Sequence, residues 1–324
     1  MKCLLNLPIF IISIVILLAS CGNKHSGNRD NSKDSLQGNI TISGAFALYP
    51  LVVKWADEYS KLHPNVNINV SAGGAGKGMT DALSGMVELG MYSKSISEEE
   101  KNKGAWWISV AKDAVLGTVS DQNPSLKDLM TKGLTKEQLY DVFITNKTKI
   151  WGQLLKTSSK EEINVYTRSD ACGAAEMWAK YLNNSKQEDI QAVGINGDPG
   201  MADALKKDLN GIGYNNVVYA YDMNTRKKFP GIEVVPLDIN GNGKIDADES
   251  FYNSLDDIMK AIKDGRYPTP PSRDLYLIAK GKPENKLVLN FLHWILTEGQ
   301  KFVPEAGYVT LTDEALTTEK TKIQ

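Results

Sequence analysis

The stretch Ser71-Ala72-Gly73-Gly74-Ala75-Gly76-Lys77-Gly78-Met79 joins two segments of different periodicity. Residues 66–70 alternate apolar and polar side chains and predict a strand, whereas residues 79–83 predict a helix. A glycine-rich turn at such a junction leaves backbone N–H groups free at the helix N-terminus, where they can hold an anion. The same glycines would also allow the helix to pack closely on a sheet, and the turn alone favours this packing role.

The turn does not match the known nucleotide-binding loops. Lys77 is followed by Gly78, where a Walker A loop has Ser or Thr. The spacing of Gly74, Gly76 and Gly78 also differs from that of the dinucleotide fingerprint. The stretch therefore does not indicate a nucleotide site.

Strands and helices are predicted in alternation along the rest of the chain. The predicted strands are 40–43, 66–70, 87–91, 113–119, 164–167, 217–220, 233–235 and 275–279. The predicted helices are the one that carries Val52, Trp55, Ala56 and Tyr59 and ends before Pro64, followed by 79–83, 134–143, 172–182, 254–263 and 285–297. This alternation indicates an α/β protein.

The first residues indicate export and lipidation. Residues 4–18 form an apolar run that follows a short basic start and is too short for a comfortable membrane span. Leu18-Ala19-Ser20-Cys21 resembles a lipobox, in which cleavage leaves Cys21 as a lipidated N-terminus; the alternative is an uncleaved anchor helix. We expect a signal peptide at 1–20, a polar flexible tether at 21–38, and a mature protein held to a membrane at its periplasmic or extracellular face.

Composition limits the remaining possibilities. About 285 residues follow the tether, enough for two lobes. The formal net charge of −2 gives no indication of nucleic-acid binding. Cys3 lies in the signal peptide and Cys21 would carry lipid, so only Cys172 remains and no intrachain disulfide is expected.

Several segments, taken in order, resemble the phosphate-binding proteins of bacterial phosphate ABC importers, in the periplasmic-binding-protein superfamily. The matching ligand loops are Ser43-Gly44-Ala45-Phe46-Ala47-Leu48-Tyr49-Pro50-Leu51 with Lys54-Trp55, then 71–79, 87–93, and Arg168-Ser169-Asp170-Ala171-Cys172-Gly173-Ala174. The other matching segments are 113–124, 197–201, 211–214, 298–300 and 307–309. The resemblance covers nearly the whole mature chain and depends on the order and spacing of these segments together.

The resemblance implies a type II periplasmic binding protein with two α/β lobes and a ligand cleft between them. Lobe 1 would comprise 39–119 with 273–324, and lobe 2 would comprise 120–272. It also implies a small oxyanion as ligand and an ABC permease as partner. The protein would then be a solute-binding lipoprotein and not an enzyme.

Only part of the family's ligand set is kept. Arg168 and Asp170 match the family's arginine and its neighbouring carboxylate, and Gly173 matches a glycine that lets the backbone approach the ligand. The full candidate set that the resemblance implies is Ala45, Phe46, Ala47, Ala75, Gly76, Ser93, Arg168, Asp170, Cys172, Gly173 and Ala174.

The family's hydroxyl donors do not match. Ala47 and Ala174 stand where Thr is expected, and Ala75 and Cys172 stand where Ser is expected. Ser93 stands where the family often has an Asp that accepts a proton from the ligand. Each unmade hydrogen bond to a buried charged group costs about 1.5–3 kcal/mol, so these losses should matter.

Three readings remain open. Backbone N–H groups and Arg168 could suffice, and the protein would then bind phosphate more weakly. Alternatively the ligand has changed, and Phe46 and Tyr49 would suit a larger or partly apolar one, although packing between lobes is the simpler role for both rings. An ion pair of Arg168 with Asp170 is compatible with both of these readings, weaker phosphate binding and a changed ligand. The third reading is a ligand-free sensor or scaffold lipoprotein.

Residues 238–249, Asp-Ile-Asn-Gly-Asn-Gly-Lys-Ile-Asp-Ala-Asp-Glu, match an EF-hand calcium loop. The predicted ligands are the side-chain oxygens of Asp238, Asn240, Asn242, Asp246 and Glu249 and the backbone carbonyl of Lys244. A strand is predicted before the loop and a helix after it, so the site would be a strand–loop–helix variant. We expect a structural calcium ion here; the alternative is a solvated Asn-Gly turn.

Catalysis is weakly supported. His25 lies in the tether, His63 at a helix end and His293 within an apolar helix, so the sequence places no histidine beside a nucleophile. Cys172 at a predicted helix N-terminus could have a lowered pKa and act as a nucleophile, but we favour the simpler role of a small residue that fills a Ser position.

Overall fold

The computed structural model describes residues 36–324, which form one compact unit. The predicted signal peptide, the lipobox with Cys21 and most of the predicted tether lie outside the described residues. Within the described range, the structure contains no helix of the length and apolarity that a membrane crossing needs.

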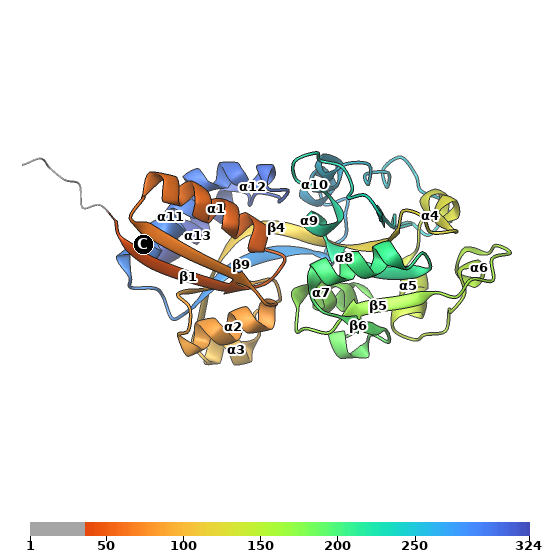
Figure 1. Ribbon diagram of the computed structural model, residues 1–324, viewed down its shortest axis with the longest axis horizontal. Helices are drawn as coiled ribbons and strands as arrows, with labels where there is room; N and C mark the ends of the chain where they lie inside the picture. Colours follow the sequence, from red (N-terminus) through yellow and green to blue (C-terminus); the bar gives the residue numbers. More distant parts are fainter. Residues whose placement is uncertain (1–35) are drawn as a thin grey trace, which may run out of the picture. The chain divides into compact units, whose positions relative to one another are not determined.

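A mixed sheet runs through this unit (Figure 1). Neighbouring strands follow the order β2-β1-β3-β9-β4-β7-β5-β6, and β8 pairs separately with β4. Pairing is parallel among β1, β2 and β3 and among β5, β6 and β7, and antiparallel wherever β4 or β9 takes part. The strands are β1 (Gly38–Gly44), β2 (Val66–Ala72), β3 (Leu89–Tyr92), β4 (Ala105–Ser120), β5 (Asn164–Arg168), β6 (Val193–Ile195), β7 (Gly211–Asn216), β8 (Ile232–Val234) and β9 (Ser272–Lys280).

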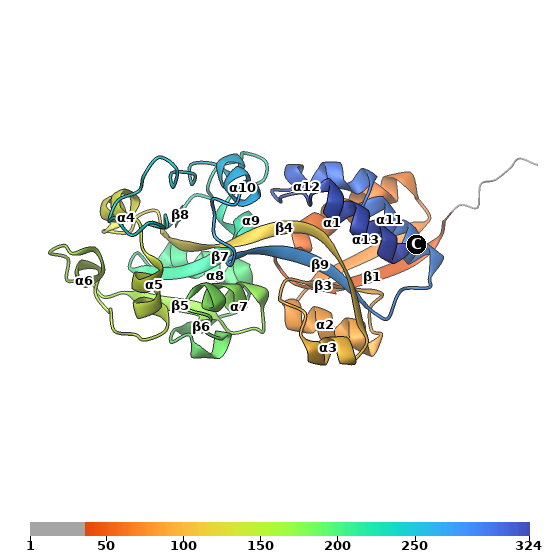
Figure 2. The ribbon, with the colours of Figure 1, turned by 180° about the vertical axis from the view of Figure 1, so that it is seen from behind.

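Strand β4 connects two hydrophobic cores. Residues 105–114 of β4 pair with β9, whereas residues 115–120 pair with β7 and β8. Figure 2 shows β4 and β9 running side by side from one half to the other. The cores change between Ala111 and Ala114, because Ala111 belongs to the first and Ala114 to the second. The expected two-lobed α/β architecture is therefore confirmed, while the lobe boundaries predicted at 119/120 and 272/273 stay a prediction.

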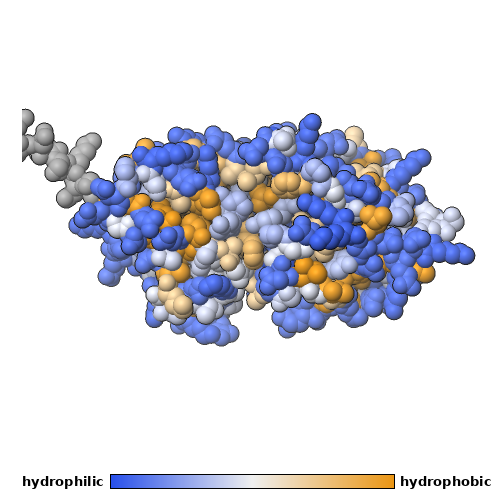
Figure 3. Space-filling model, viewed as in Figure 1, coloured by the Kyte–Doolittle hydropathy of each residue, from blue (hydrophilic) through white to orange (hydrophobic). Residues whose placement is uncertain are grey.

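Each core contains large aromatic side chains that are fully buried. The first lobe buries Trp55, Tyr59 and Phe291 completely, and the second buries Trp151 and Trp178. Hydrophilic residues dominate the face in Figure 3, consistent with the collection of apolar side chains inside. In Figures 1 and 2 the first lobe's sheet lies between α1, α11, α12 and α13 on one side and α2 and α3 on the other. These helices are α1 (Tyr49–Leu62), α2 (Ala75–Ser84), α3 (Glu98–Asn102), α11 (Lys286–Ile295), α12 (Phe302–Glu305) and α13 (Asp313–Ile323).

The second lobe carries the helices from α4 to α10. They are α4 (Leu126–Lys132), α5 (Lys136–Phe143), α6 (Trp151–Leu155), α7 (Gly173–Tyr181), α8 (Gly197–Lys207), α9 (Val217–Ala220) and α10 (Leu255–Lys263). Most predicted elements are present with shifted ends, but the prediction of a strand at 217–220 is wrong, because these residues form α9. The strand is instead β7, just before it, whose glycines and asparagines gave no strand signal.

The glycine-rich turn brings helix α2 into backbone contact with two strands. A Cβ atom on Gly78 would lie 2.4 Å from the Met91 carbonyl oxygen and 3.0 Å from the Gly44 Cα atom. A Cβ on Gly90 would lie 2.4 Å from the Gly78 carbonyl oxygen. These distances leave no room for a side chain, so the packing role expected for the glycines is confirmed at Gly78.

Gly78→Ala should lower the free energy of unfolding by about 1–3 kcal/mol, because the new methyl group must displace backbone from β1 and β3. Urea denaturation measures the change. Gly200→Ala in α8 is the matched control, since a Cβ there would meet no backbone atom within 4 Å and only one side-chain atom, Cγ2 of Ile195, at 3.2 Å. An unchanged midpoint for Gly78→Ala would contradict the packing role.

Candidate functional site

The predicted ligand loops meet where the lobes face each other. The backbone N–H of Gly76 donates to the carbonyl of Ala171 at 3.0 Å, which joins the start of α2 to the loop before α7. A Cβ on Gly173 would lie only 1.9 Å from the Ser93 carbonyl oxygen, so the start of α7 touches the loop after β3. Among the predicted residues, Phe46, Gly76 and Asp170 are partly exposed, and Ala45, Ala47, Ala75, Ser93, Arg168, Cys172, Gly173 and Ala174 are buried. The structure therefore brings all four loops together.

Two carboxylates hold the buried guanidinium of Arg168, at the end of β5. Its Nε and Nη2 donate to Asp170, each at 2.7 Å, so the ion pair that is compatible with either reading of the sequence is present. Its Nη1 donates to Asp198, which is fully buried in the first turn of α8. Burial opposes the charge, but the attraction of Asp198 and then of Asp170 raises the pKa of Arg168 above its usual value. Arg168 is therefore a permanent cation in this site.

Asp198 was not predicted as a site residue. It lies 30 positions along the chain from Arg168, and only the fold brings the two side chains together. The segment 197–201 gave no local signal for this contact, because an acidic residue in the first turn of a helix is accounted for by its favourable interaction with the helix dipole.

Several backbone N–H groups in the ligand loops have no protein acceptor, and all but that of Phe46 belong to buried residues. Across residues 36–324, the N–H groups of Phe46, Ala47, Ala75, Gly173 and Ala174 form no hydrogen bond with protein atoms. They belong to the first loop and to the N-termini of α2 and α7. Buried N–H groups are almost always paired, so these donors indicate a bound acceptor. Helix N-termini favour an anion in that role.

Cys172 caps α7. Its Sγ accepts a hydrogen bond from the Ala175 N–H at 3.4 Å, and its own N–H donates to the side chain of Gln187. Burial raises the pKa of the Cys172 thiol to about 11, so the thiol stays protonated near neutral pH. This environment supports a packing and capping role and not that of a nucleophile.

The ring of Phe46 crosses from the first lobe to cover Arg168. The Arg168 Cζ atom lies 5.5 Å from the ring centroid, and a Cβ on Gly197 would lie 3.1 Å from the ring. The Phe46 carbonyl accepts a hydrogen bond from Tyr219 Oη of the second lobe. Phe46 is thus an interlobe packing residue, whereas Tyr49 packs against the first core.

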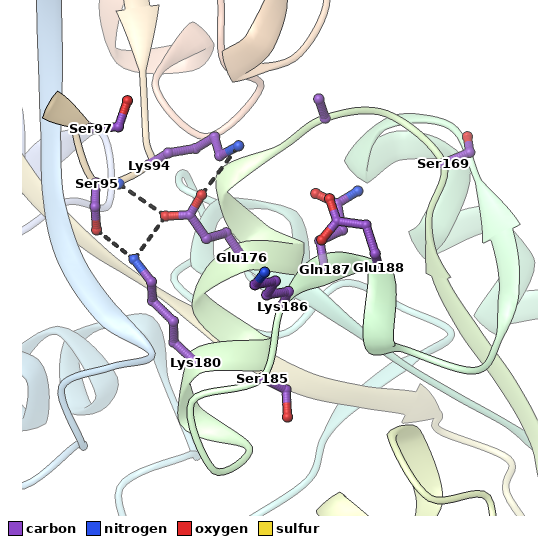
Figure 4. A pocket seen from close by; sticks show the side chains of 11 residues that line it. Lys94, Ser95, Ser97, Ser169, Glu176, Lys180, Ser185, Lys186, Gln187 and Glu188 are labelled. Carbon is purple, nitrogen blue, oxygen red and sulfur yellow. Dashed lines mark hydrogen bonds and ion pairs between the residues drawn. The ribbon is translucent and has the colours of Figure 1, made fainter. Parts of the chain in front are cut away.

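A second set of contacts between the lobes surrounds a cavity of about 510 Å³ beside the Arg168 loop (Figure 4). Glu176 of α7 pairs with Lys94 of the first lobe at 3.2 Å and accepts a hydrogen bond from the Ser95 N–H at 3.1 Å. Lys180 bonds both Glu176 and the Ser95 hydroxyl. These charged side chains tie α7 to the segment after β3 in the arrangement described here.

The predicted calcium loop folds around two buried carboxylates. Asp238 accepts hydrogen bonds from the N–H groups of 241–243, and Glu249 from those of 239, 240 and 246. The Asp246 carboxylate is held by Lys244 and by the amide groups of Asn240 and Asn242. Within residues 36–324, no group of three or more His, Cys, Asp and Glu side chains is gathered at metal-binding distance.

Fold and site together define a two-lobed α/β solute-binding protein with a candidate anion site between its lobes. The chain belongs to the PBP superfamily, since a model of the PBP superfamily domain matches residues 30–298. The expected membership of the periplasmic-binding-protein superfamily is confirmed.

Similar proteins include two named phosphate-binding protein PstS. The protein from Bacillus subtilis is 26% identical over 324 residues, which cover 97% of this chain and 96% of that protein. The one from Staphylococcus epidermidis is 26% identical over 307 residues, covering 92% of this chain and 86% of that protein.

Solved structures share the fold. An ABC-type phosphate transport receptor from Vibrio cholerae superposes with a TM-score of 0.59 and 18% identity, covering 84% of this chain and all of that one. A high-affinity periplasmic phosphate-binding protein solved with phosphate at pH 8.5 gives a TM-score of 0.68 and 14% identity, covering 88% of this chain and 93% of that one.

Proposed function

We propose that this protein is the extracytoplasmic solute-binding lipoprotein of an ABC importer and binds phosphate or a related oxyanion between its lobes. The observation that carries the proposal is the set of backbone N–H groups without a protein acceptor in the loops that meet the Arg168 loop. The names of the similar proteins support the choice of phosphate. An ABC permease is the partner that such a receptor requires.

The donors at this site suit a small oxyanion. Arginine has five N–H donors, and three hydrogen bonds of Arg168 go to Asp170 and Asp198, which leaves donors for a ligand. The free N–H groups come from three separate chain segments, so they can approach an anion from several directions. A dehydrated oxyanion needs such a distributed set, because each of its oxygens loses water.

The four missing hydroxyls favour weak binding. Ala47, Ala75, Cys172 and Ala174 are all buried, and none of them offers a hydroxyl donor to the site. A ligand other than phosphate is the second candidate, since Phe46 covers Arg168 with an apolar ring. Binding to unmodified protein separates the two.

Calorimetry with inorganic phosphate should show weak or absent binding to the unmodified protein. The combined change Ala47→Thr, Ala75→Ser, Cys172→Ser and Ala174→Thr should tighten binding by several orders of magnitude, since each regained charge-assisted bond contributes about 1.5–3 kcal/mol. These contributions will not add fully at neighbouring sites. Adding Arg168→Ala should cancel the gain, because the anion would lose a cationic partner.

Two outcomes would contradict these expectations in different ways. Tight phosphate binding by the unmodified protein would support the proposed function and show that the backbone donors suffice without the hydroxyls. No phosphate binding by either the unmodified or the four-residue variant would overturn phosphate as the ligand, and a thermal-shift screen of other oxyanions would follow.

We also propose that the mature protein is anchored through lipid on Cys21, as the lipobox indicates. Metabolic labelling with a fatty acid tests this anchor. Labelling should be lost on Cys21→Ser, and labelling that persists in this variant would contradict the proposal.

A structural calcium ion in the loop 238–249 is a further proposal. Asp238 and Glu249 are 4% and 3% exposed, and neither forms an ion pair within residues 36–324. A cation between them would compensate two buried negative charges. The amides of Asn240 and Asn242 would have to rotate so that oxygen, and not nitrogen, faces the ion. Such rotations exchange atoms of nearly equal size, so the loop need not refold.

Chelation of calcium should lower the melting temperature, because an ion that binds only the folded loop stabilises it. Asp238→Ala with Glu249→Ala should abolish the response, whereas Glu98→Ala with Glu99→Ala, which changes charge equally on α3, should retain it. Differential scanning calorimetry at millimolar calcium suits the range of about 10⁻⁴–10⁻³ M expected for extracellular sites. Equal melting curves with calcium and with chelator would sink the idea.

A further inference from the structure

A continuous line of buried hydrogen bonds leads away from Arg168 into the body of the protein. Asp198 bonds Arg168 through one carboxylate oxygen and accepts the N–H of Asn216 through the other, at 3.0 Å. The side-chain oxygen of Asn216 accepts a hydrogen bond from Nη2 of Arg273. Arg273 then holds both oxygens of Asp113, at 2.8 and 3.1 Å. The line has no break between the ligand-loop arginine and Asp113.

The far end of this line lies on the two strands that connect the lobes. Asp113 is on β4 and Arg273 is directly opposite it on β9. Their side chains are 1% and 5% exposed. Burial raises the pKa of Asp113 even though Arg273 opposes the shift, so this carboxylate depends on its partner to remain charged. A rigid charged pair is thus built into the connection between the lobes.

We propose that Asp113 and Arg273 are positioning residues for Arg168, acting through Asn216 and Asp198. The identity of the ligand in this inference rests on the proposed function, whereas the positioning of Arg168 does not depend on it. Asp198 is the only member of the line that touches Arg168, and its carboxylate is oriented from behind by the N–H of Asn216. The guanidinium of Arg168 is therefore connected through Asp198 and Asn216 to strands β4 and β9, and it is also bound directly by Asp170 of its own loop.

Because of its position, Asn216 can be substituted so that the line is interrupted without removing a member of either ion pair. Asn216 holds Asp198 through its backbone N–H and Arg273 through its side chain. Asn216→Ala therefore cuts the line at its middle while keeping both ion pairs and the backbone donor. Tyr267→Phe is the matched control, since it removes one buried hydrogen bond in the same region, from Tyr267 Oη to the carbonyl of Val115, which pairs with Asn216 across β4 and β7 but is not a member of the line.

The test follows the guanidinium resonances of Arg168 by NMR, assigned through their loss in Arg168→Lys. Asn216→Ala should speed the exchange of these protons with water by up to roughly tenfold, the factor that corresponds to the loss of one buried hydrogen bond. Tyr267→Phe should leave the exchange unchanged even where it lowers the melting temperature. Unchanged exchange in Asn216→Ala would overturn the positioning role, whether or not the protein binds phosphate.

Calorimetry with inorganic phosphate supplies the second measurement. If the unmodified protein binds phosphate, Asn216→Ala should weaken the affinity by up to roughly tenfold, as expected for the loss of one supporting hydrogen bond, and Tyr267→Phe should not. An equal affinity in Asn216→Ala and unmodified protein would overturn the link between the strands and the ligand site. If the unmodified protein binds no phosphate, phosphate fails as the ligand, and the exchange rates alone decide the positioning role.

Discussion

The guanidinium of Arg168 sits in buried space between two lobes, and its charge sets the conditions for the structure around it. Burying one cation requires carboxylates at hydrogen-bond distance, and Asp170 and Asp198 meet that requirement from opposite sides. Asp198 in turn must be satisfied, which draws in β7 and, through Arg273, the crossover strands. The site is therefore continuous with the connection between the lobes.

Main-chain donors complete the site, and they explain why closure and ligand binding should be linked. In the described arrangement, N–H groups at the starts of α2 and α7 are buried without a protein acceptor, which costs free energy. An anion would supply the missing acceptor for both lobes at once. A ligand that satisfies donors only when the lobes are together shifts the population toward the closed form.

The periodicity of apolar residues and the positions of turn-forming residues in the sequence predicted much of the fold. Alternation at 66–70 and the apolar period of 286–295 are local signals, and both elements are present. Strand β7 gave no such signal, because Gly211 and Gly213 are poor strand formers and the strand forms only by pairing with β4 and β5. The two valines at 217–218 favoured a strand locally, yet a buried helical turn of four residues forms there. Asp198 was missed for a related reason, since no local pattern marks a contact made across 30 positions.

Gly78 of α2 and the alanines of the ligand loops affect the site in different ways. Gly78 positions the helix, whereas the alanines determine which side-chain donors the site has. Gly78 is fixed by contact, because any side chain would collide with the Met91 carbonyl. The alanines at 47, 75 and 174 are also buried, but they stand where the resemblance places hydroxyl donors, and the substitutions proposed above would restore those donors. Packing therefore fixes the position of the helix start that presents backbone N–H groups. The side chains at the ligand loops affect affinity separately, through the donors that they add or lack. A chain can therefore keep the frame that presents backbone N–H groups even where its side-chain donors differ, and the four positions at 47, 75, 172 and 174 are where such a difference stands in this chain.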